Sequence, residues 1–149
     1  APVVLLVAMD QPPDVLVADT TRAIALRGAE GLGQIDGKAG SFAVEVWTET
    51  YGEPIGRGVA RCDGVGCLAA SPRGFTLALL EDPAGFYEDC ATVDLVITRR
   101  TAPRSCQAPV VIDADDLAAG GVHWLRWDGD RFELRTAKTG PRRPWRTEP

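Results

Sequence analysis

The sequence predicts an α/β domain in which short buried strands alternate with short helices. Three observations favour this class. Apolar residues make up 45% and charged residues 25% of the 149 residues, which is the balance of a folded globular domain. Short apolar runs recur along the chain, and segments with helix start and stop signals stand between them in the second half. Strand, helix, strand is the alternation typical of α/β proteins.

The first half of the chain contains weaker patterns than the second. Its apolar runs are short, and a glycine-rich stretch interrupts them. Ser41 is a plausible N-cap and Gly52 a plausible helix end, although β-branched and aromatic residues between them leave a strand possible. The expected elements are a hairpin (15–18 and 22–27), turns (28–40) with a short strand near 32–35, and a helix (41–52).

The second half gives clearer signals. Asp82-Pro83 provides an N-cap and a first-turn proline for a short helix that continues through Cys90. Asp113, followed by acids and later by glycines, begins a second helix. The expected strands are three buried ones (75–80, 93–97 and 110–112) and a final hairpin (122–127 and 131–136) around Asp128-Gly129-Asp130.

The chain is expected to form one domain over residues 14–149. Its last part, 137–149, lacks periodicity and should lie over the surface as a basic tail. The apolar run at 1–9 is far shorter than the roughly 20 residues that span a bilayer, and it lacks signal-peptide features. It is either a buried strand or the remnant of a membrane segment that enters the domain through a linker, residues 1–13.

The net charge of −5 means that the molecule as a whole repels a phosphate backbone. A role with nucleic acid therefore requires a local basic patch. Two stretches supply candidates, one without acids in the middle of the second half and one in the tail. The candidate DNA-binding residues are Arg99, Arg100 and Arg104 in the first stretch, and Arg142 and Arg143 in the second.

The four cysteines are Cys62, Cys67, Cys90 and Cys106. Zinc knuckles usually separate paired cysteines by about two to four residues, so the C-x4-C of 62–67 is at the edge of that range and has no second knuckle. A thiol nucleophile needs a base, and the only histidine, His123, is expected to be a packed or half-exposed strand residue. Disulfides are favoured, with reduced buried thiols as the alternative, and they indicate an oxidising compartment.

Four cysteines can pair in three ways. The most local pairing joins Cys62 to Cys67 across a glycine turn, and Cys90 to Cys106 between a helix end and a later loop. The second bond closes a loop of about 15 residues, which is worth about 3 kcal/mol in the chain-entropy account.

No other pattern in the chain indicates a catalytic, metal or cofactor site. The glycines of 31–37 do not run from a strand into a helix, and no phosphate loop or histidine cluster is present. Adjacent carboxylates point in different directions on a helix, and most of them suit capping better than catalysis. These carboxylate pairs are Glu81-Asp82, Glu88-Asp89 and Asp115-Asp116.

Several segments, taken in order, resemble the C-terminal region of ComEC-type competence proteins of alphaproteobacteria. The segments are PPDVLV (12–17), F-x-x-E-x-W (42–47), CDGVGC (62–67), EDCATVDLVI (88–97), VIDADDL (111–117) and RRPW (142–145). The resemblance covers nearly the whole chain, and its strength lies in the order of the segments. It implies a degenerate metallo-β-lactamase-like sandwich of mixed sheet and short helices.

The metal-binding residues of that family are missing here. The family carries an H-x-H-x-D-H cluster and a later H-H-G-S, whereas this chain has TRRTAPRSC after the strand at 93–97. No family ligand can be carried over, and three remaining acids, Asp14, Asp19 and Asp36, do not make a bimetallic site without imidazoles. We therefore expect no metal, no cofactor and no catalytic residue.

The resemblance implies a role in natural transformation, in which a membrane channel imports single-stranded DNA. The domain would be a non-catalytic accessory domain on the periplasmic face of the cytoplasmic membrane. It would contact single-stranded DNA, or brace its own channel domain and other DNA-uptake proteins. Two alternatives stay open: a metal-dependent nuclease that degrades the non-transported strand, and a protein-interaction scaffold of an exported protein.

Overall fold

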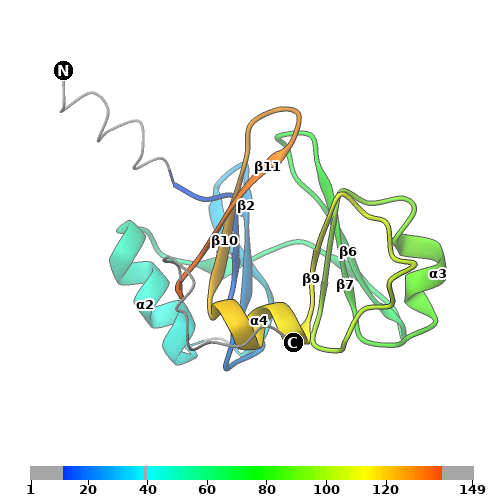
Figure 1. The fold of residues 1–149 in the computed structure, drawn as a ribbon. Helices are drawn as coiled ribbons and strands as arrows, with labels where there is room; N and C mark the ends of the chain where they lie inside the picture. Colours follow the sequence, from blue (N-terminus) through cyan, green and yellow to red (C-terminus); the bar gives the residue numbers. More distant parts are fainter. Residues whose placement is uncertain (1–11, 39, 139–149) are drawn as a thin grey trace, which may run out of the picture.

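The computed structural model describes residues 12–38 and 40–138. Within these residues the strands form two mixed sheets that face each other, with a short helix on the outer face of each and a third helix at one end between them (Figure 1). The α/β class predicted from the sequence is therefore confirmed. The N-terminal run at 1–9, most of the 1–13 linker, and most of the tail, with Arg142 and Arg143, lie outside the described residues.

The larger sheet has six strands and takes them from both ends of the chain. Its order is β11-β10-β1-β2-β3-β4, and every pair is antiparallel except β3 with β4. The final hairpin thus pairs with β1, where Val17 faces His123. The strands are β1 (Val15–Val17), β2 (Ile24–Gly28), β3 (Gly31–Asp36), β4 (Gly56–Arg57), β10 (His123–Trp127) and β11 (Phe132–Thr136).

The smaller sheet has five strands in the order β5-β6-β7-β8-β9. Its first two pairs are antiparallel, and β7, β8 and β9 are parallel to one another. Parallel strands that are buried on both faces need continuous apolar runs, and β8 is buried at all four positions. The strands are β5 (Arg61–Cys62), β6 (Gly66–Ala70), β7 (Thr76–Leu80), β8 (Leu95–Thr98) and β9 (Val110–Ile112).

The apolar residues form three layers of core. The central core lies between the sheets and includes Val15, Leu77 and Leu125, none of which is exposed to solvent. A second cluster packs α2 (Phe42–Tyr51) against the outer face of the larger sheet. A third packs α3 (Gly85–Asp89) and the loop 99–109 against the outer face of the smaller sheet. The result is a sandwich of helix, sheet, sheet and helix (Figure 1).

Most of the elements expected from the sequence are present. The first hairpin, the strand near 32–35, the 41–52 helix, the three buried strands and the final hairpin are confirmed. Gly52 ends α2 with a left-handed φ of 65°. Asp113 caps α4 (Ala114–Gly120) in a reciprocal capping box with Asp116. His123 is buried in β10, as expected of a packed strand residue.

The helix predicted from Asp82-Pro83 begins later than expected. Its first residue is Gly85, and Cys90 follows its last turn. The Asp82 side chain instead accepts the backbone N–H of Ala84 at 2.9 Å, in the turn before the helix. The strands β4, β5 and β6 were not predicted from the sequence. They are short, contain glycine or are exposed, and they show no alternation of apolar and polar residues.

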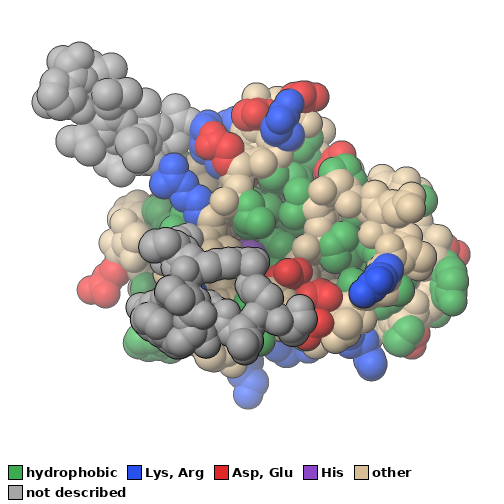
Figure 2. All heavy atoms as spheres, viewed as in Figure 1, with side chains coloured by type: hydrophobic (Ala, Val, Ile, Leu, Met, Phe, Trp, Pro, Cys, Tyr) green, Lys and Arg blue, Asp and Glu red, His purple; other side chains and the backbone are tan. Residues whose placement is uncertain are grey.

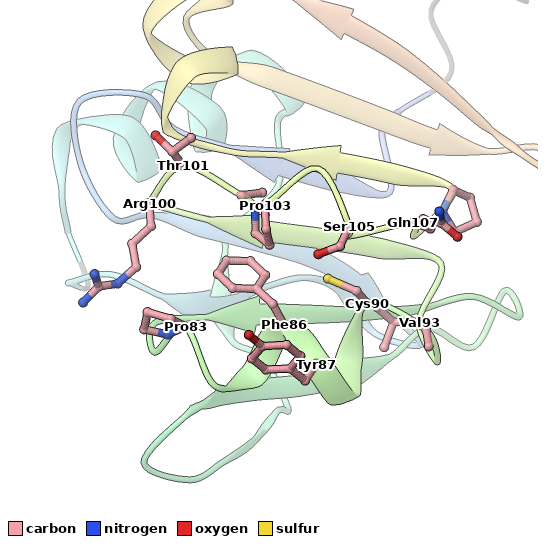
Figure 3. A pocket seen from close by; sticks show the side chains of 13 residues that line it. Pro83, Phe86, Tyr87, Cys90, Val93, Arg100, Thr101, Pro103, Ser105 and Gln107 are labelled. Carbon is pink, nitrogen blue, oxygen red and sulfur yellow. The ribbon is translucent and has the colours of Figure 1, made fainter.

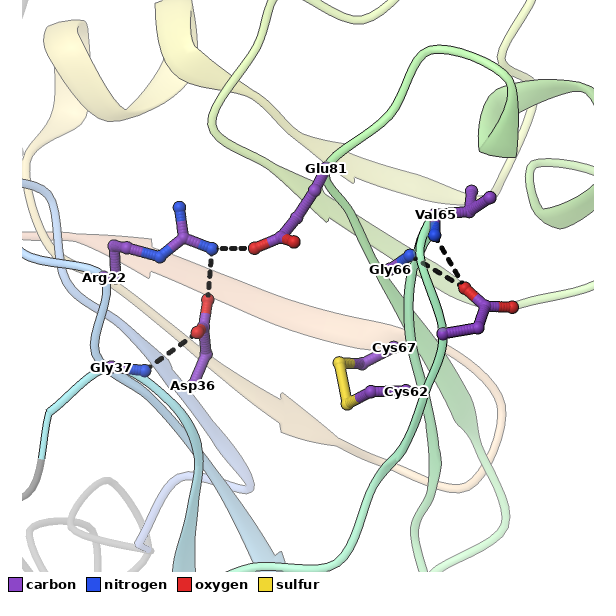
Figure 4. Close-up of a disulfide and its surroundings, with 9 residues drawn as sticks. Arg22, Asp36, Gly37, Cys62, Val65, Gly66, Cys67 and Glu81 are labelled. Carbon is purple, nitrogen blue, oxygen red and sulfur yellow. Dashed lines mark hydrogen bonds and ion pairs between the residues drawn. A yellow bond between two sulfur atoms is a disulfide. The ribbon is translucent and has the colours of Figure 1, made fainter.

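The cysteines form the two disulfides of the most local of the three possible pairings. Cys62 and Cys67 face each other across β5 and β6 (Figure 4), and Cys90 is joined to Cys106. Residues 12–38 and 40–138 contain no helix with the length and apolarity that crossing a bilayer requires.

Candidate functional site

The first candidate feature is a groove between α3 and the loop 99–109, which we call the α3 groove. It has a volume of about 940 Å³. Aromatic and proline side chains line one wall, loop residues line the other, and Arg100 stands at one end (Figure 3). Its principal lining residues are Pro83, Phe86, Tyr87, Arg100, Pro103 and Ser105.

The two neighbouring aromatic residues of α3 differ in their exposure to solvent. Phe86 is only 7% exposed and anchors α3 to the smaller sheet, whereas Tyr87 is 89% exposed. Successive helix residues point in different directions, so burial of the first ring turns the second to solvent. Such a ring is available for stacking. Tyr87 was not identified from the sequence, although two adjacent aromatic residues in a short helix were a signal that one of them would be exposed.

The loop 99–109 is fixed at several points. At its start, the backbone N–H of Arg100 donates to Thr98 Oγ1, and the Arg100 carbonyl accepts from Ala114 at 3.0 Å. The backbone N–H of Ala102 donates to Asp113 Oδ2 at 2.9 Å. Farther along, the disulfide from Cys106 ties the loop to the end of α3. The arginines of this loop are therefore carried by a backbone that is anchored at several points.

Electrostatics at the start of α4 support this anchoring. Burial on its own would raise the pKa of Asp113, but backbone N–H groups of Ala102 and Asp116 outweigh it and hold the pKa below its usual range. Burial raises the pKa of Asp116, the other member of the capping box. Asp113 thus carries the negative charge that caps the helix and ties down the loop.

The three loop arginines do not point the same way. Arg99 donates from Nη1 to the carbonyl of Ala18, at the end of β1 in the larger sheet. Arg100 donates from Nε to the carbonyl of Glu81 at 2.6 Å and lines the α3 groove. Arg104 is exposed, and no hydrogen bond or ion pair joins it to another residue of 12–38 or 40–138.

The second candidate feature is a cluster of charged residues where the two sheets meet at one end, which we call the end cluster: Asp19, Arg22, Asp36, Glu81 and Arg99. Arg22 forms ion pairs with Asp36 of β3, with Nη2 and Oδ2 3.4 Å apart, and with Glu81, which follows β7 (Figure 4). Together with the bond from Arg99 to Ala18, these contacts join one sheet to the other. Arg22 was not identified from the sequence, because nothing local indicates its partners.

Two of the three acids that the sequence left as possible metal ligands, Asp14 and Asp36, are engaged with other groups of the protein. Asp14 is 1% exposed, and its Oδ2 accepts the backbone N–H of Trp127 at 2.8 Å and lies 3.4 Å from Nε of Arg73. Asp36 is occupied by Arg22 and by the N–H of Gly37. Within the described part of the chain, no group of three or more His, Cys, Asp or Glu side chains could hold a metal ion.

The described surface carries charges of both signs. On the face shown in Figure 2, arginine and lysine side chains are interspersed with acidic ones rather than gathered into one broad patch. On this face any contact with nucleic acid must therefore be local, in keeping with the net charge of −5.

Comparison with protein-family models, with curated proteins and with solved structures finds no match.

Proposed function

We propose that this chain is a non-catalytic accessory domain of a membrane channel that imports single-stranded DNA, and that the α3 groove contacts the strand. The observation that carries the proposal is the position of Tyr87, 89% exposed on the groove whose end holds Arg100. Proteins that bind single strands without sequence preference combine stacking rings with cations in this way.

The groove suits a flexible strand. A base can stack on the Tyr87 ring, while the guanidinium of Arg100 and the exposed side chain of Arg104 are available to phosphates along the same loop. Because the loop is anchored at α4 and at Cys106, little ordering of the protein is required when the strand binds.

The resemblance to ComEC-type proteins supplies the setting of the proposal. The layering of helix, two sheets and helix is compatible with a degenerate metallo-β-lactamase-like sandwich. Two disulfides support an oxidising compartment such as the periplasm. The partners would be single-stranded DNA, the channel's own membrane domain and other DNA-uptake proteins.

The positions of the acids favour a non-catalytic role over the nuclease alternative. Asp14, which would be needed for a carboxylate metal site, is buried and engaged with Trp127 and Arg73. Its carboxylate accepts a hydrogen bond from β10 and so helps to hold the β10–β11 hairpin against β1.

The test is fluorescence anisotropy with a labelled oligothymidylate across a chloride series, with and without manganese. Tyr87→Ala should weaken binding roughly 5-fold to 150-fold, because one stacked base is worth about 1–3 kcal/mol. Phe42→Ala is the matched control, since Phe42 is a 77% exposed ring on α2. Arg100→Gln and Arg104→Gln should each reduce the slope of log affinity against log salt by about 0.7.

Equal effects of Tyr87→Ala and Phe42→Ala would overturn the groove as the contact. Cleavage of the strand only with manganese would support the nuclease alternative instead. If neither binding nor cleavage occurs, the scaffold alternative stands and the search moves to protein partners.

A further inference from the structure

Arg99 has a pair of unused hydrogen-bond donors. Its Nε and Nη2 are both buried, and neither has a partner among the residues that the structure describes. Only Nη1 is engaged, by the carbonyl of Ala18. Buried donors of a charged group that lack partners are rare and costly, so each calls for an explanation.

The two unused donors are the ones that act together. In a guanidinium group Nε–H and one Nη2–H point in parallel from the same side, and this side binds two oxygens of a carboxylate or phosphate at once. Arg99 therefore presents a complete bidentate fork. Burial lowers the pKa of Arg99, and attraction from Asp36 opposes this effect.

The nearby carboxylates are engaged with other groups. Asp36 accepts the N–H of Gly37 at 2.8 Å through Oδ1 and pairs with Arg22 through Oδ2. Glu81 pairs with Arg22 as well. Asp19 attracts Arg99 through its charge, yet makes no hydrogen bond to the fork. No carboxylate of the described residues therefore accepts a hydrogen bond from Nε or Nη2 of Arg99, and these two donors are available to an added anion.

We propose that the end cluster is an oxoanion site, in which Arg99 holds two oxygens of a phosphate group through Nε and Nη2. A phosphate is favoured over a carboxylate because it has further oxygens, and a second guanidinium group, that of Arg22, lies beside Arg99. Arg22 is 51% exposed, is close enough to repel Arg99, and pairs with Glu81. Because Nε and Nη2 of Arg99 are buried, a side chain must move to admit the anion, and we expect the exposed side chain of Arg22 to do so.

The inference does not need the α3 groove to bind DNA. Arg99 contacts the larger sheet, whereas the groove lies on the outer face of the smaller one. The phosphate could come from solution or from the end of a DNA strand, and the chemistry of the site is the same for both. A terminal phosphate has three oxygens available, which suits the fork and its neighbours better than an internal phosphodiester.

The experiment is calorimetric titration of the 149-residue chain with inorganic phosphate, with ionic strength matched by chloride. Arg99→Lys keeps the charge but removes the fork, and Arg99→Gln removes both. Each should weaken phosphate binding by about tenfold or more. Arg131→Gln is the control, since Arg131 is an exposed arginine in the β10–β11 turn, at the far end of β10 from the end cluster. Circular dichroism confirms that each variant is folded.

Two oligothymidylates then distinguish the sources, one with a 5′-phosphate and one with a 5′-hydroxyl group. A preference for the 5′-phosphate that Arg99→Lys abolishes assigns the site to a strand end. Equal affinity for both strands, with Arg99-dependent binding of inorganic phosphate, assigns it to free phosphate. Absence of phosphate binding by the wild type, or equal affinity in wild type and Arg99→Lys, overturns the proposal.

The outcomes also separate this site from the proposed strand contact. Tyr87→Ala should leave inorganic phosphate binding unchanged, because its ring is on the α3 groove. Arg99→Lys should leave the binding of the 5′-hydroxyl strand unchanged. Either proposal can therefore fail while the other stands.

Discussion

Removing the Cys90–Cys106 disulfide should destabilise this domain more than removing Cys62–Cys67. The two bonds join residues 16 and 5 positions apart, respectively. In the chain-entropy account, the longer loop is worth about 3 kcal/mol and the shorter about 2 kcal/mol at 25 °C. The longer bond also joins α3 to the loop 99–109 in the third core cluster, and Cys90 is only 5% exposed.

The assay is urea unfolding of two double variants, Cys90→Ala/Cys106→Ala and Cys62→Ala/Cys67→Ala, followed by circular dichroism. A loss of about 3 kcal/mol corresponds to a fall in Tm of roughly 6 to 12 °C for a domain of this size. Wild-type protein unfolded under reducing conditions is the companion measurement, because it breaks the bonds without removing buried sulfur atoms. A loss for the Cys90–Cys106 variant that is equal to or smaller than the loss for the other variant would refute the reasoning.

Two further predictions concern the hairpin turn between Cys62 and Cys67. Gly66→Ala should strongly lower the free energy of unfolding, because a Cβ there would lie 2.0 Å from the backbone oxygen of Leu79. Gly64→Ala is the control: a Cβ at that position meets nothing within 4 Å, so the variant should be nearly neutral in the same urea assay. Backbone N–H groups of Val65 and Gly66 hold the pKa of Asp63 below its usual range, so its stabilisation is present above the unfolded pKa of about 3.9 and is lost as pH falls through the lower folded value. Asp63→Asn should therefore flatten the acid side of the stability-against-pH curve, and an unchanged curve would count against this role.

The elements that the sequence predicted well are those specified by neighbouring residues. The capping box at Asp113 and the left-handed stop at Gly52 depend on a few positions in a row, and both are present. The pairing of the cysteines followed from the same principle, since the most local partners proved to be the bonded ones. The helix predicted from an Asp82 N-cap begins two residues late, because the Asp82 side chain caps the preceding turn instead.

The candidate sites depended on contacts that sequence patterns do not record. The exposure of Tyr87 follows from the burial of Phe86 against the smaller sheet, and the partners of Arg22 come from strands far along the chain. Arg99 and Arg100 were expected to act together as one DNA-binding group. The structure turns one toward the larger sheet and the other toward the α3 groove.

By itself, the sequence determined the α/β class, the order of most strands and helices, and the lack of a histidine metal cluster, and it favoured disulfides whose pairing the structure then supplied. Only the tertiary structure decided that the final hairpin pairs with β1 and that the Asp14 carboxylate links the two through the backbone N–H of Trp127. Local patterns reflect the backbone preferences and periodic burial of each segment. Pairing between distant segments depends on which apolar faces meet when both sheets close over one core, and that is a property of the whole chain.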